Sequence, residues 1–328
     1  MIANKRREFI KLLGGAAAAW PLAAWAQQAG AVRRIGILAD ERWPPIDSLK
    51  QGLRNLGYVE GQNLEIVYRF AAGQQERYPG LAAELVALPV ELIVALGTPA
   101  SVAAKRATET IPIVVQTGDP VAAGLVRDLA HPGGNVTGFS GQAADAEGKR
   151  LELLKELLPS LSRVAVLVNP ANSLSAVFLD NARSGATALG LRLDAVEASS
   201  VADLVERALP ALRSDRPGAV LVTADRGPLM IGRTQIAEFL MTNRLPSISS
   251  YYEHVQAGGL MAYAASYHAT YRRNVALVID KIFKGTKPGD LPVQQPTEFE
   301  LILNLKTAKA LGLEIPPTLL ARADAVIE

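Results

Sequence analysis

The sequence predicts an α/β protein of two doubly wound, parallel-sheet lobes, joined by a hinge that the chain crosses several times. Three observations support this prediction. Short runs rich in β-branched residues alternate with helical stretches, which is typical of parallel sheets covered by helices on both faces. This series occurs twice, opening with "RRIGILAD" at 33–40 and with "SRVAVLVNP" at 162–170. A chain of 328 residues is also long for one hydrophobic core.

In the first series, Gly57 follows a helical stretch at the position where glycine commonly ends a helix. The Gly-rich segment 131–141 is expected to be a turn that leads out of the lobe. Strands are expected at 34–39, 63–70, 90–96 and 111–116, and helices at 46–56, 78–88, 100–109 and 121–130.

The second series repeats this order, and after Ser250 the pattern changes. Helices are expected at 146–158, 175–189, 201–212 and 231–242, and strands at 163–169, 191–198, 219–223 and 246–250. A long amphipathic helix at 267–283, a Pro-rich link, a strand at 299–303 and a helix at 305–311 are expected to follow. We expect lobe one to comprise 27–142 and 251–288, and lobe two to comprise 143–250 and 289–328.

The N-terminal residues 1–26 have the composition of an export signal. A basic start is followed by a short apolar stretch and by Ala24-Trp25-Ala26, a small-residue cleavage pattern. Arg6-Arg7 resembles the twin-arginine signal, although export by the general pathway stays open. The alternative is a buried amphipathic helix. We expect cleavage near Ala26 and a periplasmic protein.

Charge and cysteine content exclude several classes of protein. The chain carries 34 basic and 32 acidic residues. Because 1–26 hold four of the basic and one of the acidic residues, the remainder has a net charge of −1. No basic field remains to attract nucleic acid. The absence of cysteine excludes disulfides, thiolate metal sites and a cysteine nucleophile.

Motifs for catalysis and for nucleotide binding are missing. The chain contains neither a dinucleotide fingerprint nor a phosphate loop, and it has no G-x-S-x-G nucleophile motif. The three histidines, His131, His254 and His268, have no metal-ligand spacing. We therefore predict no catalytic residues, no metal and no cofactor.

Candidate ligand-binding residues are those that directly follow the strands, because ligands of open parallel sheets bind beyond the carboxyl ends of the strands. In lobe one these are Trp43, Gly97, Thr98, Ala100, Ser101, Gly118 and Asp119, and in lobe two Asn169, Asn172, Ser173, Asp225 and Tyr251.

Each candidate also has a purely structural interpretation. Thr98, with Ala100 and Ser101, is expected to surround an anion at a helix N-terminus, or else only to cap that helix. Asp119 is expected to cap the helix that opens at Pro120, at a position close to the ligand. Asp225 is a partner for a cationic group or forms a surface pair with Arg226.

Three further interpretations stay open. The amide and hydroxyl groups of Asn169, Asn172 and Ser173 contact ligand, or they form an Asn-Pro turn. Trp43 stacks on a planar ligand or packs its loop. Tyr251 lines the hinge or cleft, or packs in an interface.

Four segments, 51–100, 110–140, 166–172 and 304–327, resemble the ABC-transporter substrate-binding protein family whose better-known members carry tryptophan and related amino acids. "LGYVEGQN" and "GDPV…LAHPGGNVTG" are the most specific motifs. The resemblance implies a type I periplasmic binding fold that closes on a small solute and delivers it to a permease and its ATPase.

The resemblance also implies roles for particular residues. The loop Gly97–Ser101 would hold a ligand carboxylate, and Asp119 and Asp225 would lie near the ligand. Where tryptophan-type members have Thr-Asp-Asn, this chain has Ala224-Asp225-Arg226.

We therefore expect a non-catalytic, monomeric solute-binding protein for an amino acid or aromatic acid. The alternatives are a ligand sensor that presents its closed form to a membrane receptor, and a secreted α/β enzyme.

Overall fold

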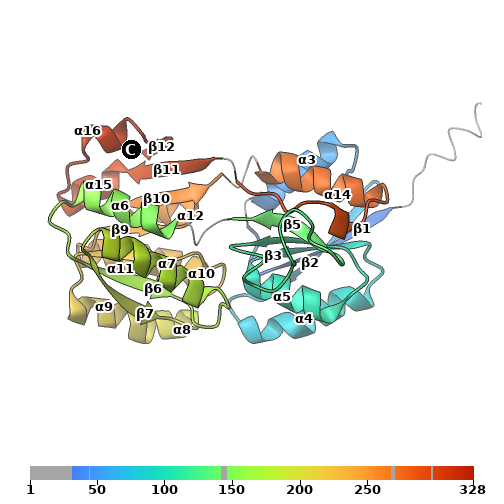
Figure 1. Cartoon of the computed structure of the whole chain (residues 1–328), viewed down its shortest axis with the longest axis horizontal. Helices are drawn as coiled ribbons and strands as arrows, with labels where there is room; N and C mark the ends of the chain where they lie inside the picture. Colours follow the sequence, from blue (N-terminus) through green and yellow to red (C-terminus); the bar gives the residue numbers. More distant parts are fainter. Residues whose placement is uncertain (1–31, 44, 142–145, 267–269, 297) are drawn as a thin grey trace, which may run out of the picture.

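The computed structural model describes residues 32–43, 45–141, 146–266, 270–296 and 298–328. They form two α/β lobes that lie side by side, with the chain passing between them (Figure 1). This confirms the predicted fold class. The expected export signal and His268 lie outside the described residues. None of the described helices combines the length and the apolar content that a membrane crossing requires.

The first lobe is built on a five-stranded parallel sheet with the order β2-β1-β3-β4-β5. Its strands are β1 (Arg33–Ala39), β2 (Leu64–Phe70), β3 (Leu92–Leu96), β4 (Ile113–Thr117) and β5 (Val136–Ser140). One face packs on α3 (Pro45–Asn55), η3 (Tyr271–Val275) and α14 (Ala276–Phe283), and the other on α4 (Tyr78–Ala87) and α5 (Thr98–Ala107) (Figure 1). Short 3-10 turns are η1 (Gln75–Arg77) and η4 (Pro288–Asp290).

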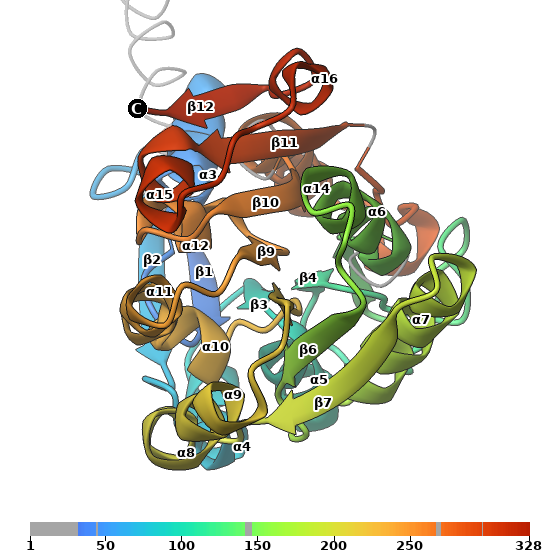
Figure 2. The ribbon, with the colours of Figure 1, turned by 90° about the vertical axis from the view of Figure 1, so that its left-hand side faces the viewer.

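The second lobe contains a seven-stranded sheet with the order β12-β11-β10-β9-β8-β6-β7 (Figure 2). Only the β10–β11 pair is antiparallel. The strands are β6 (Arg163–Val168), β7 (Arg192–Glu197), β8 (Ala219–Val222), β9 (Ser247–Ser249), β10 (Met261–Ala265), β11 (Phe299–Asn304) and β12 (Ala325–Ile327).

Helices cover both faces of this second sheet, as the apolar content of its strands requires. One face packs on α6 (Glu147–Leu157), α7 (Ser175–Ala188), α15 (Leu305–Leu311) and α16 (Pro317–Leu320). The other packs on η2 (Leu204–Ala208), α9 (Leu209–Asp215), α10 (Pro228–Ile231) and α11 (Arg233–Thr242). Shorter helices are α8 (Val201–Asp203) and α12 (Tyr252–Gln256).

The segment 121–141 differs from the prediction. Asp119 accepts the N–H groups of Val121 and Ala122, as the cap of a helix would, but no helix forms at 121–130 because the chain turns through a left-handed Gly124 (φ 67°). The Gly-rich segment contains β5 rather than only a turn. Gly138 allows β5 to pair closely with β4, since a Cβ there would collide with the backbone of Val115.

The division between the lobes also differs from the expected one. The strand β10 pairs with β9 and β11, so 251–265 belong to the second lobe rather than the first. Conversely, 288–294 return to the first lobe, where the N–H of Gln294 donates to the carbonyl of Gly138 at 2.8 Å. The reason is long-range strand pairing, which local sequence patterns do not encode.

Candidate ligand-binding site

The candidate site lies where the loops after the strands of the two lobes meet. One hydrophobic cluster joins both lobes, with Trp43 and Leu96 from the first and Phe178, Met230 and Tyr251 from the second. The approach is close. A Cβ built on Gly118 would lie 3.1 Å from Leu174 and 3.2 Å from Phe178, both of the second lobe. The lobes are therefore in contact along the cleft.

Arg226 lies at the centre of this contact. Its Cζ atom lies 3.4 Å from the ring centroid of Trp43 and 4.0 Å from that of Tyr251. Its Nη1 atom lies 3.6 Å from Oε1 of Glu253, and the indole N–H of Trp43 donates to the same carboxylate. Burial alone raises the pKa of Glu253, but Arg226 and the Trp43 N–H outweigh it and lower that pKa below its usual value. The cluster thus holds an ionised Glu253 beside a guanidinium.

Trp43 and Tyr251 are the two predicted site residues that contact Arg226 through their rings. The side chain of Trp43 is 3% exposed and that of Tyr251 is 5% exposed. Gly97 completes the enclosure, since a Cβ built on it would lie 3.1 Å from Cβ of Arg226. The two lobes therefore enclose the guanidinium between two aromatic faces.

Two buried carboxyl groups from opposite lobes lie beside this cluster. Asp40 accepts the N–H of Gly73 at 2.7 Å, and Asp225 accepts the Asn169 amide at 2.9 Å. A Cβ built on Gly227 would lie 3.3 Å from one oxygen of each carboxyl. Burial raises the pKa of Asp40 to about 7 and also raises that of Asp225. The surface-pair interpretation of Asp225 is wrong, because Asp225 is 1% exposed and the ion pair of Arg226 is with Glu253.

The residues predicted at the N-terminus of α5 point in several directions. The helix begins at Thr98, and Gly97 (φ 92°) rather than Thr98 is its cap. The Thr98 hydroxyl instead pairs with that of Thr117 at 2.7 Å. Ser101 donates to the carbonyl of Gly97 at 2.8 Å, and Ala100 packs in the core of the first lobe. Gly97 is the member of this group that lies close to Arg226, since a Cβ built on it would lie 3.1 Å from Cβ of Arg226.

Of the remaining predicted residues, some lie at the cluster around Arg226 and others bond within their own turns. Asn169 holds Asp225, while Asn172 accepts the N–H of Leu174 at 3.1 Å within a turn. Ser173 is exposed, and the Asp119 carboxylate is used by the N–H groups of its own turn. The structure therefore brings together Trp43, Gly97, Asn169, Asp225 and Tyr251, and it leaves Ser173 and the Asp119 carboxylate outside this group.

Sequence reasoning missed three contributors to the cluster. Arg226 appeared only as a neighbour of Asp225, and Asp40 was not singled out. Glu253 lies in the short helix α12, whose position beside Trp43 depends on the packing of the two lobes. The sequence signal that could have identified Asp40 and Arg226 is their position shortly after a strand. No sequence signal pointed to Glu253.

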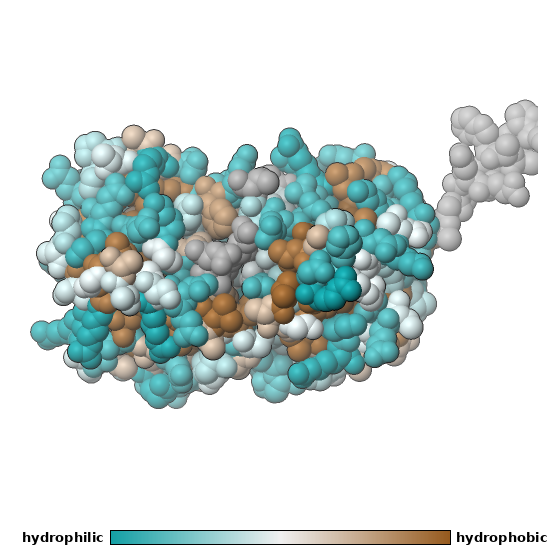
Figure 3. Space-filling view, viewed as in Figure 1, coloured by the Kyte–Doolittle hydropathy of each residue, from teal (hydrophilic) through white to brown (hydrophobic). Residues whose placement is uncertain are grey.

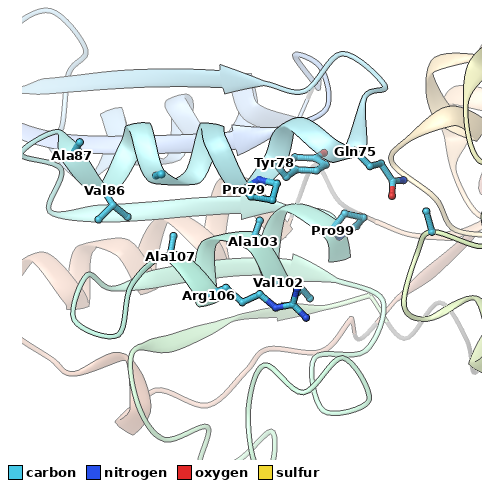
Figure 4. Close-up of a pocket in the computed structure, with 12 residues that line it drawn as sticks. Gln75, Tyr78, Pro79, Val86, Ala87, Pro99, Val102, Ala103, Arg106 and Ala107 are labelled. Atoms are coloured by element: carbon cyan, nitrogen blue, oxygen red, sulfur yellow. The ribbon is translucent and has the colours of Figure 1, made fainter.

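The space left inside the cleft is small. A cavity of about 10 Å³ lies between the lobes, lined by Ala39, Asp40, Glu41, Trp43, Leu96, Arg226 and Met230. A larger groove of about 570 Å³ runs outside the cleft between α4 and α5 (Figure 4). Gln75 and Tyr78 form its polar end, and Gln75 points toward the loops of the second lobe (Figure 4). We place the site in the cleft, because the groove is lined mostly by Ala, Val and Pro side chains.

Polar residues cover most of one face of both lobes, with hydrophobic residues gathered in separate patches (Figure 3). Within the described ranges, no group of three or more His, Asp or Glu side chains could hold a metal ion.

Comparisons with known proteins point to one family. Residues 39–327 match the family model described as ABC transporter substrate binding protein. A tyrosine-binding protein from Clostridioides difficile (strain R20291) is 29% identical over 287 residues, which cover 86% of this chain and 81% of that protein.

Two solved structures have equal sequence identity to this chain, 26% over 90% of its length, but different overall similarity. An ABC domain from Streptococcus pneumonia in complex with L-Trp, covered over its full length, has a TM-score of 0.82. A substrate-binding protein with adhesive properties from Clostridium difficile, in its ligand-free, open form and covered over 99%, has a TM-score of 0.63. The overall structure is therefore more similar to that of the ligand-bound relative than to that of the open one.

Proposed function

Because this chain belongs to the ABC transporter substrate-binding protein family, we propose that it is the periplasmic receptor of an importer and binds a small carboxylate-bearing solute between its lobes. It is a solute-binding protein and not an enzyme. An amino acid is the preferred ligand class. The observation that carries this proposal is the convergence of Trp43, Asp40, Asp225 and Tyr251, from both lobes, on one cleft.

The cleft offers complementary groups for the two ends of an amino acid. The helix α5 begins at the cleft, and the free N–H groups and dipole of its first turn favour a carboxylate. Asp40 and Asp225 supply carboxyl oxygens for an ammonium group. These two sets of groups support a zwitterionic solute.

Buried amide groups near the cleft also support a polar ligand. Within the described part of the chain, Oε1 of Gln116 and Nε2 of Gln75 are buried without a hydrogen-bond partner. Gln116 is next to Leu96 across β3 and β4, and Leu96 lines the small cavity. An unsatisfied buried polar atom is unfavourable, so a ligand that bonds to these amides would be stabilised.

Export and delivery to a permease complete the proposal. The composition of residues 1–26 supports export, and closure of two lobes on a solute is a recognised mode of ligand-dependent recognition. We propose that the closed form, acting as a monomer, is what a membrane permease and its ATPase recognise.

A thermal-shift screen tests the binding step. Residues 27–328, which include every described element, would be screened against amino acids, aromatic acids and small carboxylates. A ligand at 100 times its Kd should stabilise the protein by about 2.7 kcal/mol, which raises Tm by roughly 4 °C for a chain of this length. The matched control is the variant Asp40→Asn/Asp225→Asn, which removes the proposed ammonium site and should lose this shift. If no solute raised Tm and a hydrolase panel gave turnover, the proposal would be wrong.

A further inference from the structure

The aromatic pair in the cleft is already occupied by a side chain of the protein. The guanidinium of Arg226 lies between the rings of Trp43 and Tyr251, 3.4 Å and 4.0 Å from their centroids. A planar group between two aromatic faces is the arrangement in which a flat ligand would stack. The two rings come from different lobes, so this space exists only when the lobes are together.

Several contacts hold Arg226 in this position. Its charge is balanced by Glu253 at 3.6 Å, and Glu253 is itself fixed by the indole N–H of Trp43. The backbone at Gly97 lies against its Cβ. The side chain is only 6% exposed, so moving it out would separate a buried ion pair and open both aromatic contacts.

The described residues leave little free space beside Arg226. The cavity there has a volume of about 10 Å³, which is roughly enough for one water molecule, so any amino acid needs the lobes to open further than they are here. A phenol or indole ring that stacks between Trp43 and Tyr251 would also need the space that the guanidinium fills. A compact aliphatic solute that uses only the polar positions at Asp40, Asp225 and the N-terminus of α5 would leave the guanidinium in place.

We infer that Arg226 is a specificity-determining residue that fills the aromatic subsite and restricts the cleft to amino acids with compact, non-aromatic side chains. This inference rests on the proposed function and narrows its ligand class. Removing the guanidinium should open the space between Trp43 and Tyr251 and admit an aromatic ring.

Trp43 provides a direct readout. It is the single tryptophan of residues 27–328, since the other two are Trp20 and Trp25. Selective excitation of tryptophan therefore reports from the cleft itself. Binding of L-phenylalanine, L-tyrosine, L-alanine and L-leucine would be followed by this fluorescence and by calorimetry.

The variants are Arg226→Ala and Arg226→Ala/Glu253→Gln, of which the second avoids leaving a buried carboxylate without its cation. We expect each to bind L-phenylalanine or L-tyrosine at least about tenfold more tightly than the wild type does, and to bind L-alanine and L-leucine no more tightly, because both variants lose the contacts of Arg226 between the lobes. Guanidinium ion should compete with L-phenylalanine in the variants and not in the wild type. The control Arg213→Ala, at an exposed position of α9, should behave as the wild type.

The outcomes separate the inference from the proposed function. If the wild type binds L-tyrosine or L-phenylalanine as tightly as the variants do, the inference is wrong and the proposed function stands. Failure of guanidinium to compete in the variants would also overturn the inference. If neither the wild type nor any variant binds a small solute, the inference and the proposed function are both wrong.

Discussion

The indole of Trp43, in the first lobe, donates its N–H to the carboxylate of Glu253, in the second lobe. A second contact between the lobes is the ion pair of Glu41 with Arg233 at 2.8 Å, which is about one-third exposed. The Trp43–Glu253 bond is the more shielded of the two, so we expect it to contribute more to holding the lobes together.

The variant Trp43→Phe tests this bond. Phenylalanine keeps an aromatic face for Arg226 but removes the N–H donor, so Glu253 loses one of its hydrogen bonds. A hydrogen bond to a charged group is worth about 1.5–3 kcal/mol, and we expect ligand affinity to fall roughly tenfold. Calorimetry and small-angle scattering should report weaker binding and a larger radius of gyration. An unchanged radius of gyration and ligand affinity would contradict a role of the Trp43–Glu253 bond in holding the lobes together. The matched control for ring size is Trp43→Tyr.

Gly227→Ala should prevent full closure. The added Cβ would lie 2.7 Å from Nε2 of Gln75 and 3.3 Å from oxygens of Asp40 and Asp225. Gln75 and Asp40 belong to the opposite lobe, so the lobes can relieve the contact by separating. We expect ligand affinity to fall by about tenfold or more while Tm without ligand changes little.

The control for this variant is Gly80→Ala in α4, where a Cβ would have no atom within 4 Å. It should leave affinity unchanged and raise stability by about 0.5–1 kcal/mol, the usual gain of alanine over glycine in a helix. If the Gly227→Ala protein and the wild type bound ligand with equal affinity, closure of the lobes would not require the close approach at Gly227.

Asp40 should make stability depend on pH. Its pKa is raised, mainly by burial, from 3.8 to about 7, so the folded chain binds this proton more tightly than the unfolded chain does. Its contribution is therefore fully present below pH 4, is lost as pH rises toward 7, and is constant above that. Urea unfolding at intervals from pH 4 to 8 would measure this slope.

Asp40→Asn should flatten that slope, because asparagine stays neutral. Asp119→Asn, at a turn whose carboxylate bonds only to backbone N–H groups of the same turn, is the matched control and should keep the wild-type slope over this range. If the Asp40→Asn protein lost stability with rising pH as steeply as the wild type, another group would have to carry the effect.

Gly52→Ala should destabilise the first lobe. A Cβ on Gly52 of α3 would collide with the carbonyl of Arg272 and lie 2.8 Å from Cβ of Ala276. The two helices would have to move apart, which typically costs about 1–3 kcal/mol. Chemical denaturation of the Gly52→Ala and Gly80→Ala proteins measures the difference in their free energies of unfolding. A stability equal to that of the control would mean that this helix contact is loose.

The alternating strands and helices were accessible from the sequence, because each depends on neighbours within a few residues. For this reason β1, β3, α6, β6 and α15 lie where the patterns place them. The helix expected at 121–130 was wrong because the left-handed Gly124 turns the chain where the apolar pattern suggested a helix. The strand β10 was missed because it is defined by pairing with β9 and β11, which are separate segments of the chain, and not by a local sequence pattern.

Periodicity and loop position are local properties of the chain, so the two α/β lobes, the family and the positions after each strand could be predicted without coordinates. Which of those residues meet depends on the tertiary structure. It brought Trp43 of one lobe onto Arg226 and Glu253 of the other, turned Ser101 and Ala100 into the first lobe, and buried Asp40 beside Asp225. The contacts between the lobes join residues more than 180 positions apart, and they arise from the packing of two separately formed surfaces rather than from any local preference.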